Sequence, residues 1–105
     1  MKPLGRMTPA TADVLEALLD AADPVWGLRV VKATGRPAGS VYPILERLER
    51  LGWTTSQWDD DTDRAGPRRR IYLLSDGARA SARAVVSEIQ ARQVRMTAPT
   101  RAARA

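Results

Sequence analysis

Residues 36–52 constrain the fold of this chain more than any other segment. Their apolar side chains recur at three- and four-residue spacing, which is the period of a helix with one buried face. This stripe consists of Val41, Ile44, Leu45, Leu48 and Leu51. Pro43 fits the helix if it begins near Gly39 or Ser40, because backbone N–H groups in a first turn mostly lack helical partners. Gly52 is a suitable C-terminal stop.

Two more helices are predicted before this one. Thr8 and Pro9 supply an N-cap and a proline at the first helical position, and the helical spacing of apolar residues then continues to about residue 23. A second helix is predicted over residues 25–34, with Leu28 and Val31 facing inward and Gly35 ending it. The short link that follows, residues 35–38, is typical of the turn in a helix-turn-helix.

After Gly52 the pattern changes to that of a β-hairpin. Residues 53–58 are rich in β-forming side chains, a polar loop follows, and residues 70–74 form the return strand. Ser75 then precedes a long helix predicted over residues 76–96. Three helices, a two-stranded hairpin and a final helix make a mainly helical α+β fold, in the order of a winged helix-turn-helix. We expect a loose arm at residues 1–7, the winged domain at 8–75, and a disordered basic tail at 97–105.

Composition excludes several function classes. The chain has 105 residues, enough for one domain, and a net charge of +5 that favours a polyanionic partner. It has no cysteine and no histidine, so thiolate and imidazole metal sites and the commonest general base are excluded. No apolar run approaches the ~20 residues of a membrane span, and the first eight residues lack a signal-peptide core. We expect a cytoplasmic protein that is not an enzyme and holds no cofactor or metal.

The outer face of the third helix and the basic entry to the second strand are the candidate double-stranded DNA contacts. Helical geometry places Gly39, Tyr42, Pro43, Glu46 and Arg50 opposite the apolar stripe. Gly39 and Ser40 would admit a phosphate at the helix N-terminus, while Glu46 or Arg47 would read base edges. The predicted DNA-binding residues are Lys32, Arg36, Gly39, Ser40, Tyr42, Pro43, Glu46, Arg47, Arg68, Arg69 and Arg70.

Three adjacent arginines repel one another, and a polyanion would relieve that repulsion. Alternation along a strand puts Arg69 on the opposite face from Arg68 and Arg70, so we expect at least two of them to contact phosphates or the minor groove. The alternative is a winged-helix module that binds proteins and not DNA. Pairing of the three arginines with the acidic residues 59–63 would favour that alternative. The acidic run itself lacks the glycine and closing glutamate of a calcium loop, and we interpret it as a solvated wing tip.

The last predicted helix carries a heptad-like apolar seam, interrupted by Arg92. We expect this seam to form a homodimer interface of Ala78, Ala82, Val85, Ile89 and Met96, since the helix is longer than a compact domain requires. The alternative is packing on the first helix of the same chain. Trp26, Trp53 and Trp58 are more typical of a core or an interface than of a ligand pocket.

Three segments resemble PadR-type transcriptional regulators: residues 24–28 (PVWGL), residues 39–45 (GSVYPIL) with Leu48 and Gly52, and residues 66–72 (GPRRRIY) with Gly77. The resemblance covers residues 4–93. It implies a cytoplasmic homodimer that binds pseudo-palindromic operator DNA, usually represses neighbouring genes, and often releases DNA when a small-molecule effector binds. It also implies that Tyr42 contacts DNA. The chain departs from longer members in ending soon after the fourth helix, so that helix, with or without the first, would form the dimer. Ile71 replaces an aromatic residue of the family pattern.

Overall fold

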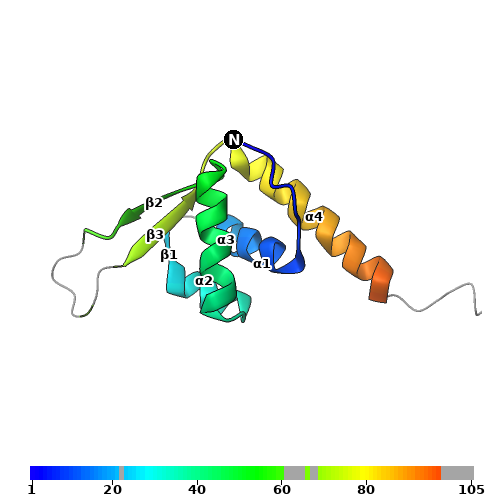
Figure 1. Cartoon of the computed structure of the whole chain (residues 1–105), viewed down its shortest axis with the longest axis horizontal. Coiled ribbons are helices and arrows are strands. Elements are labelled where there is room, and N and C mark those ends of the chain that lie inside the picture. The colour runs from blue at the N-terminus through cyan, green and yellow to red at the C-terminus, as the bar shows by residue number, and fades with distance from the viewer. Residues whose placement is uncertain (22, 61–65, 67–68, 98–105) are drawn as a thin grey trace, which may run out of the picture.

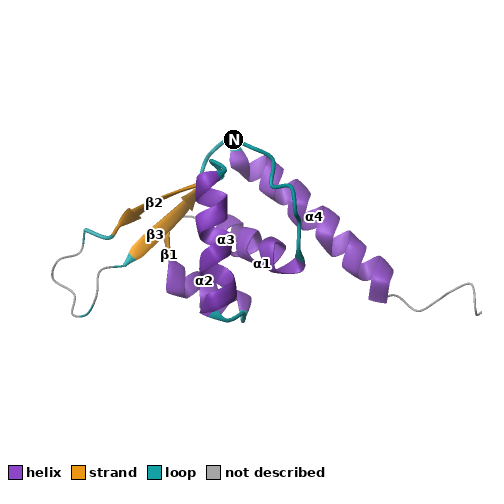
Figure 2. Ribbon diagram, viewed as in Figure 1, coloured by secondary structure: helices purple, strands orange, loops and turns teal. Residues whose placement is uncertain are grey.

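The computed structural model of the chain describes residues 1–21, 23–60, 66 and 69–97. Within these residues the elements follow in the order α1 (Pro9–Asp20), β1 (Val25–Trp26), α2 (Gly27–Thr34), α3 (Ala38–Arg50), β2 (Thr54–Trp58), β3 (Arg70–Leu74) and α4 (Ala78–Thr97). The β2–β3 hairpin, called the wing below, and the end of α4 project from opposite sides of the helical body (Figure 2). The mainly helical α+β winged fold predicted from the sequence is therefore confirmed.

The sheet contains one strand that the sequence did not predict. Its order is β1-β3-β2, with antiparallel pairing throughout, and Val25 and Trp26 lie opposite Tyr72 and Ile71 of β3. We had assigned Val25 and Trp26 to the second helix, which instead begins at Gly27. A β-branched residue followed by an aromatic one favours an extended backbone once a partner strand is present. The short strand joins the base of the wing to the start of α2.

The predicted helix ends are largely confirmed. The hydroxyl of Thr8 accepts the backbone N–H of Thr11 at 3.2 Å and caps α1, and Gly35 ends α2 with a left-handed φ of 69°. One explanation was wrong: α3 begins at Ala38, so Pro43 lies inside the helix and not in its first turn. Proline has no N–H to donate to the carbonyl of residue i−4, here the exposed Gly39, where water can take that place.

The core lies where α1, α3, α4 and the sheet meet. Leu15, Leu45, Leu48 and Leu74 are almost wholly inaccessible to solvent, and they come from α1, α3 and β3. Burying a side chain of this kind stabilises the fold by ~1.5–3 kcal/mol relative to leaving it exposed. The second helix contributes Val30 to the core. Of the two residues that we expected to face inward, Val31 is half-buried and packs against the core, whereas Leu28 is half-buried and lies outside it.

The seam of α4 packs on α1 of the same chain. Ala78, Ala82, Val85 and Ile89 are all buried within the single chain, whereas Met96 is 84% exposed. The first four therefore do not form the free dimer surface that we predicted. The heptad-like spacing was correct, but spacing does not say which helix covers a seam, and the apolar face of α1 does so here. The end of α4 continues past α1 into solvent (Figure 1).

The N-terminal segment, residues 1–7, is packed and not loose. Leu4 is buried, the backbone N–H of Lys2 donates to the Leu51 carbonyl at 2.8 Å, and the indole N–H of Trp53 donates to the Lys2 carbonyl at 2.6 Å. The segment runs from the start of α4 down to α1 (Figure 1). We expected a loose arm because residues 1–7 show no periodicity; one buried leucine and the two hydrogen-bonded backbone groups of Lys2 hold it instead.

Candidate nucleic-acid interface

The exposed side of α3 carries five residues at helical spacing. Gly39, Ser40, Pro43, Glu46 and Arg50 are all exposed, and Pro43, Glu46 and Arg50 border a shallow groove of about 490 Å³ together with Glu49. No side chain caps the first turn of this helix, and a Cβ added to Gly39 would meet open space. The first-turn N–H groups of such a helix, together with the positive end of its dipole, form a surface suited to an anion.

Tyr42 lies on the flank of α3 and not on its exposed side. It is half-buried, and its ring covers Gly27 at the start of α2: a Cβ on Gly27 would come within 2.8 Å of Tyr42 Cε1 and 3.3 Å of Tyr72 Cε1. The fully outward position that we predicted for Tyr42 was therefore wrong. The helical period could not reveal this, because β3, the strand that carries Tyr72, passes beside this flank of α3 and covers it.

Arg47 lies on the opposite flank of α3, where it is tied to the N-terminal segment. Its guanidinium donates to the carbonyl of Leu4 and, at 3.2 Å, to the carbonyl of Arg6. A guanidinium only donates hydrogen bonds, and its N–H groups have a fixed planar geometry. The two carbonyls therefore occupy N–H donors that Arg47 would need to contact DNA. The sequence suggested Arg47 as a base-reading residue; in the structure its side chain holds residues 4–6 against α3.

Glu49, on the same flank as Tyr42, connects α3 to the wing. One carboxylate oxygen accepts the Ser56 hydroxyl of β2, and the other lies 3.6 Å from Arg70 Nη2 of β3. The Arg70 guanidinium also lies 5.0 Å from the centre of the Trp58 ring. Arg70 was predicted as a phosphate contact and is in contact with two other elements of its own chain, α3 and β2. Burial is the largest influence on the neighbouring Tyr72, whose pKa is raised above its ordinary value.

Arg69 faces a different aromatic residue. Its guanidinium lies 4.1 Å from the centre of the Trp26 ring, and its Nε is buried without a hydrogen-bond partner among the described residues. The two residues line a cleft of about 610 Å³ together with Asp23 and Arg29. A guanidinium over an indole ring is an attractive cation–π arrangement. Arg69 and Arg70 thus contact separate tryptophans, on β1 and β2.

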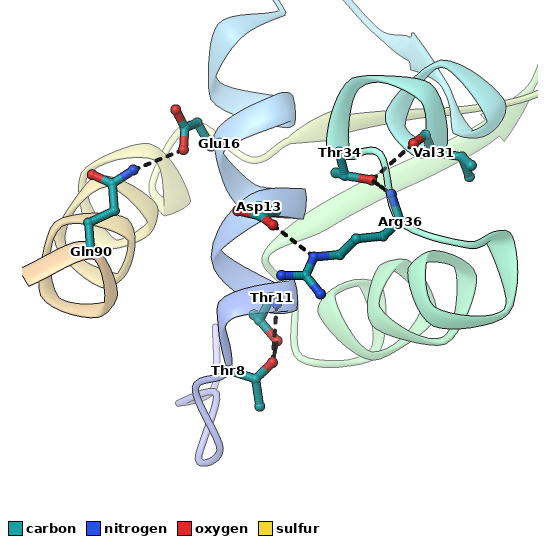
Figure 3. Close-up of polar contacts among 8 residues, drawn as sticks. All are labelled: Thr8, Thr11, Asp13, Glu16, Val31, Thr34, Arg36 and Gln90. Atoms are coloured by element: carbon teal, nitrogen blue, oxygen red, sulfur yellow. Dashed lines mark hydrogen bonds and ion pairs between the residues drawn. The ribbon is translucent and has the colours of Figure 1, made fainter. Parts of the chain in front are cut away.

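Arg36 joins the turn between α2 and α3 to α1 (Figure 3). Its Nε lies 2.7 Å from Asp13 Oδ2, and its backbone N–H donates to the Thr34 hydroxyl at 3.2 Å. Lys32, on α2, is exposed. Of these two predicted DNA contacts, Lys32 therefore presents a free surface, whereas Arg36 shares its charge with a carboxylate.

Comparison with known proteins identifies the family. A family model described as the transcriptional regulator PadR-like family matches residues 14–84, more than half of the chain. The chain belongs to this family. The PadR-like model spans the part of α1 from Val14, the helix-turn-helix, the wing and the first part of α4, so the exposed side of α3 lies inside the shared region. No curated protein matches the sequence.

Solved structures share the fold of this PadR-like chain at low identity. The circadian clock-associated protein Pex from Anabaena has 20% identity and a TM-score of 0.65, over 84% of this chain and 80% of Pex. A MarR-family regulator from Silicibacter pomeroyi has 20% identity and a TM-score of 0.66, over 92% of this chain and 61% of that one. Overoxidized AbfR bound to DNA has 22% identity and a TM-score of 0.62, over 81% of this chain and 59% of AbfR.

Two parts of the predicted site lie outside the described residues, namely Arg68 and residues 61–63 of the acidic run. The sequence missed the role of Glu49, because nothing in the local pattern relates it to Ser56 or to Arg70. Arg50 was recognised as outward-facing but omitted from the predicted contacts, although its spacing from Pro43 and Glu46 places it on their side of the helix. In the described part of the PadR-like chain no group of acidic side chains could hold a metal ion, and no helix is long and apolar enough to cross a membrane.

Proposed function

We propose that this chain is a sequence-specific DNA-binding transcriptional regulator, acting as a homodimeric repressor on a pseudo-palindromic operator. The exposed side of α3 enters the major groove, and the wing approaches the backbone or the minor groove. The observation that carries this proposal is the row formed by Gly39, Ser40, Pro43, Glu46 and Arg50, exposed together on the second helix of the helix-turn-helix. In helix-turn-helix proteins this helix is the one that lies in the groove.

The residues of this row suit different contacts with DNA. The uncapped first turn of α3 and the open space beside Gly39 support a phosphate at the N-terminus of the helix. Further along, Arg50 is an exposed cation that forms no ion pair with the described residues, unlike Arg36 and Arg70, and Glu46 is an exposed carboxylate. Glutamate can bond to a cytosine edge in the major groove, and an arginine beside it can neutralise a phosphate. The similarity of the fold to AbfR, which has been solved bound to DNA, supports DNA as the partner.

The dimer would use the end of α4 in place of the buried seam. Val94 and Met96 are 64% and 84% exposed on the part of the helix that extends past α1. Val94 and Met96 are two positions apart and point to different sides of the helix. Met96 continues the spacing of the apolar seam and suits a helix–helix contact with a second copy, and a two-fold dimer would place its two α3 helices on half-sites about one DNA turn apart. A small-molecule effector, if the family resemblance extends to one, would find its place in the cleft beside Trp26 and Arg69.

The alternative, a protein-binding winged helix that does not bind DNA, also has support in the structure. Arg69 and Arg70 are both engaged with groups of their own chain, which leaves the wing with fewer free cations than the sequence suggested. Arg70 is paired with Glu49 of α3, however, and this differs from the pairing with the acidic run that would favour the alternative. The exposed side of α3 is unaffected by either contact.

A pair of charge-matched substitutions tests the proposal. Arg50→Gln removes a cation from the exposed side of α3, and Arg92→Gln removes one from α4, where it pairs with Glu88 at 2.8 Å. Arg50→Gln should weaken binding to an operator duplex and lower the slope of log K against log salt by about 1. Arg92→Gln should leave the affinity and the slope unchanged, because Arg92 lies away from the proposed DNA-binding side of α3. The net charge falls equally in the two variants, so a difference between them reflects position and not total charge. Equal effects, or an effect of Arg92→Gln alone, would contradict the proposed orientation.

A further inference from the structure

The guanidinium of Arg70, on β3, contacts groups from α3 and β2. It lies 3.6 Å from the Glu49 carboxylate and 5.0 Å from the centre of the Trp58 ring. Arg70 and Trp58 are also paired residues in the β2–β3 register. Arg70 is the first residue of β3 and Trp58 the last of β2, so the contacts with Glu49 and Trp58 hold the Arg70 side chain where the wing leaves the domain.

Glu49 completes the connection from the side of α3. Its second oxygen accepts the hydroxyl of Ser56, which lies opposite Tyr72 in the sheet register. A single carboxylate on the helix is thereby bonded to both strands of the wing. Glu49 also borders the groove formed with Pro43, Glu46 and Arg50, so this connection lies directly beside the surface proposed to meet DNA.

We propose that Glu49 and Arg70 are positioning residues that hold the wing at a fixed angle to α3, so that helix and wing can contact one DNA duplex together. This inference rests on the proposed function and revises one part of it: Arg70 acts through Glu49 and not as a phosphate contact. About a third of each side chain is exposed, and ion pairs of this kind contribute little to folding stability. Substitutions at either position therefore leave the domain folded, and their effect is on the arrangement of the two DNA-contacting elements.

Glu49 makes the inference testable because charge and positioning predict opposite results. Removing a carboxylate beside the DNA-facing groove should tighten binding if only charge matters, since DNA is a polyanion. Removing the group that holds the wing should weaken binding, because the wing must then be ordered when the complex forms. Glu46 supplies the matched control: it lies one turn earlier, borders the same groove and has the same charge.

The experiment compares Glu49→Gln, Arg70→Gln, the double variant, Glu46→Gln and Arg50→Gln in the full chain. Binding to a fluorescent operator duplex and to a scrambled duplex is followed by anisotropy at several salt concentrations, and thermal unfolding confirms that each variant folds. We expect Glu49→Gln and Arg70→Gln each to weaken operator binding about tenfold, which corresponds to ~1.4 kcal/mol. The double variant should be no weaker than either single variant, because both break the same connection. The salt slope should stay at its wild-type value.

On the scrambled duplex, where base reading does not enter, Glu46→Gln should bind as tightly as the unmodified chain or more tightly, while Glu49→Gln binds more weakly. Tighter binding by Glu49→Gln would overturn the inference. So would a fall of the salt slope by about 1 for Arg70→Gln, as expected for Arg50→Gln, because that is the signature of a lost phosphate contact. Either result would leave the proposed function standing. Absence of DNA binding by the unmodified chain would overturn the proposed function and this inference together.

Discussion

The edge of the Tyr42 ring lies against Gly27, so that a single added carbon on Gly27 would approach Tyr42 Cε1 to 2.8 Å. The contact joins α3 to the first residue of α2, and Tyr72 of β3 closes the same space at 3.3 Å. Gly27 is therefore required for close packing and not for an unusual backbone angle. The orientation of α3, and with it the surface proposed to enter DNA, depends on this small space.

Gly27→Ala should lower the free energy of unfolding by about 1–3 kcal/mol, as other overpacked substitutions do. The rigid rings of Tyr42 and Tyr72 cannot move aside without shifting α3 or β3. Gly39→Ala is the matched control: its Cβ would meet nothing within 4 Å, so it should be neutral or stabilise the helix by up to ~1 kcal/mol. Urea unfolding of both variants measures the difference. A neutral Gly27→Ala would show that the space beside Tyr42 is larger than described.

Two substitutions of Tyr42 separate packing from DNA contact. Tyr42→Ala should lower the free energy of unfolding by about 1–3 kcal/mol, because loss of the half-buried ring uncovers Gly27 and Tyr72. Tyr42→Phe keeps the ring and should unfold like the unmodified chain. If the hydroxyl contacts DNA, as the family resemblance implies, Tyr42→Phe should still weaken operator binding, by about 2- to 10-fold for one hydrogen bond. Unchanged affinity in Tyr42→Phe would assign Tyr42 to packing alone.

The two halves of α4 should respond differently to truncation. Ile89→Ala should lower the free energy of unfolding by about 2–5 kcal/mol, because Ile89 is buried within the chain. Met96→Ala should change the stability of the single chain by less than ~0.5 kcal/mol and weaken self-association instead. Unfolding at one fixed protein concentration and sedimentation at several concentrations distinguish the two effects. If Ile89→Ala changed only self-association, the result would support the dimer interface first predicted from the sequence, with Ile89 in it.

The raised pKa of Tyr72 predicts a loss of stability in alkali. Burial, the largest cause, favours the neutral phenol in the folded chain, so that below the ordinary pKa of 10.0 both folded and unfolded chains are protonated. As the pH rises above that value the unfolded chain ionises first, and the free energy of unfolding falls. Tyr72→Phe should show a shallower fall between about pH 9 and 11 in urea unfolding, over the range in which tyrosine ionises. Parallel pH profiles for the two proteins would contradict this assignment.

Features that depend on neighbouring residues in the sequence were predictable. The Thr8 cap, the left-handed Gly35 and the period of α3 follow from local chemistry and are confirmed. The exposed row on α3 follows from the same period. These features establish the order of helices and strands, from which the winged helix follows.

Features that depend on distant partners were not predictable. Val25 and Trp26 form a strand only because Tyr72 and Ile71 lie beside them, and a two-residue segment is too short to show the alternation that predicts a strand. The link from Glu49 to Arg70 spans twenty-one positions, by the difference of their numbers, and has no sequence signature. The α4 seam illustrates the same limit: its apolar period was correct, but the choice between α1 and a second copy depends on the tertiary arrangement.

The most direct test of the central claim is a titration of the purified chain onto the DNA upstream of its own gene and onto a scrambled duplex of equal length. Fluorescence anisotropy at several salt concentrations gives both affinities and the salt slope. A sequence-specific regulator should prefer the upstream duplex by ~10³-fold or more at physiological salt, with a steep slope for both duplexes. Equal weak binding to the two duplexes would reduce the interaction to charge attraction, and no binding at low salt would contradict the DNA-binding function itself.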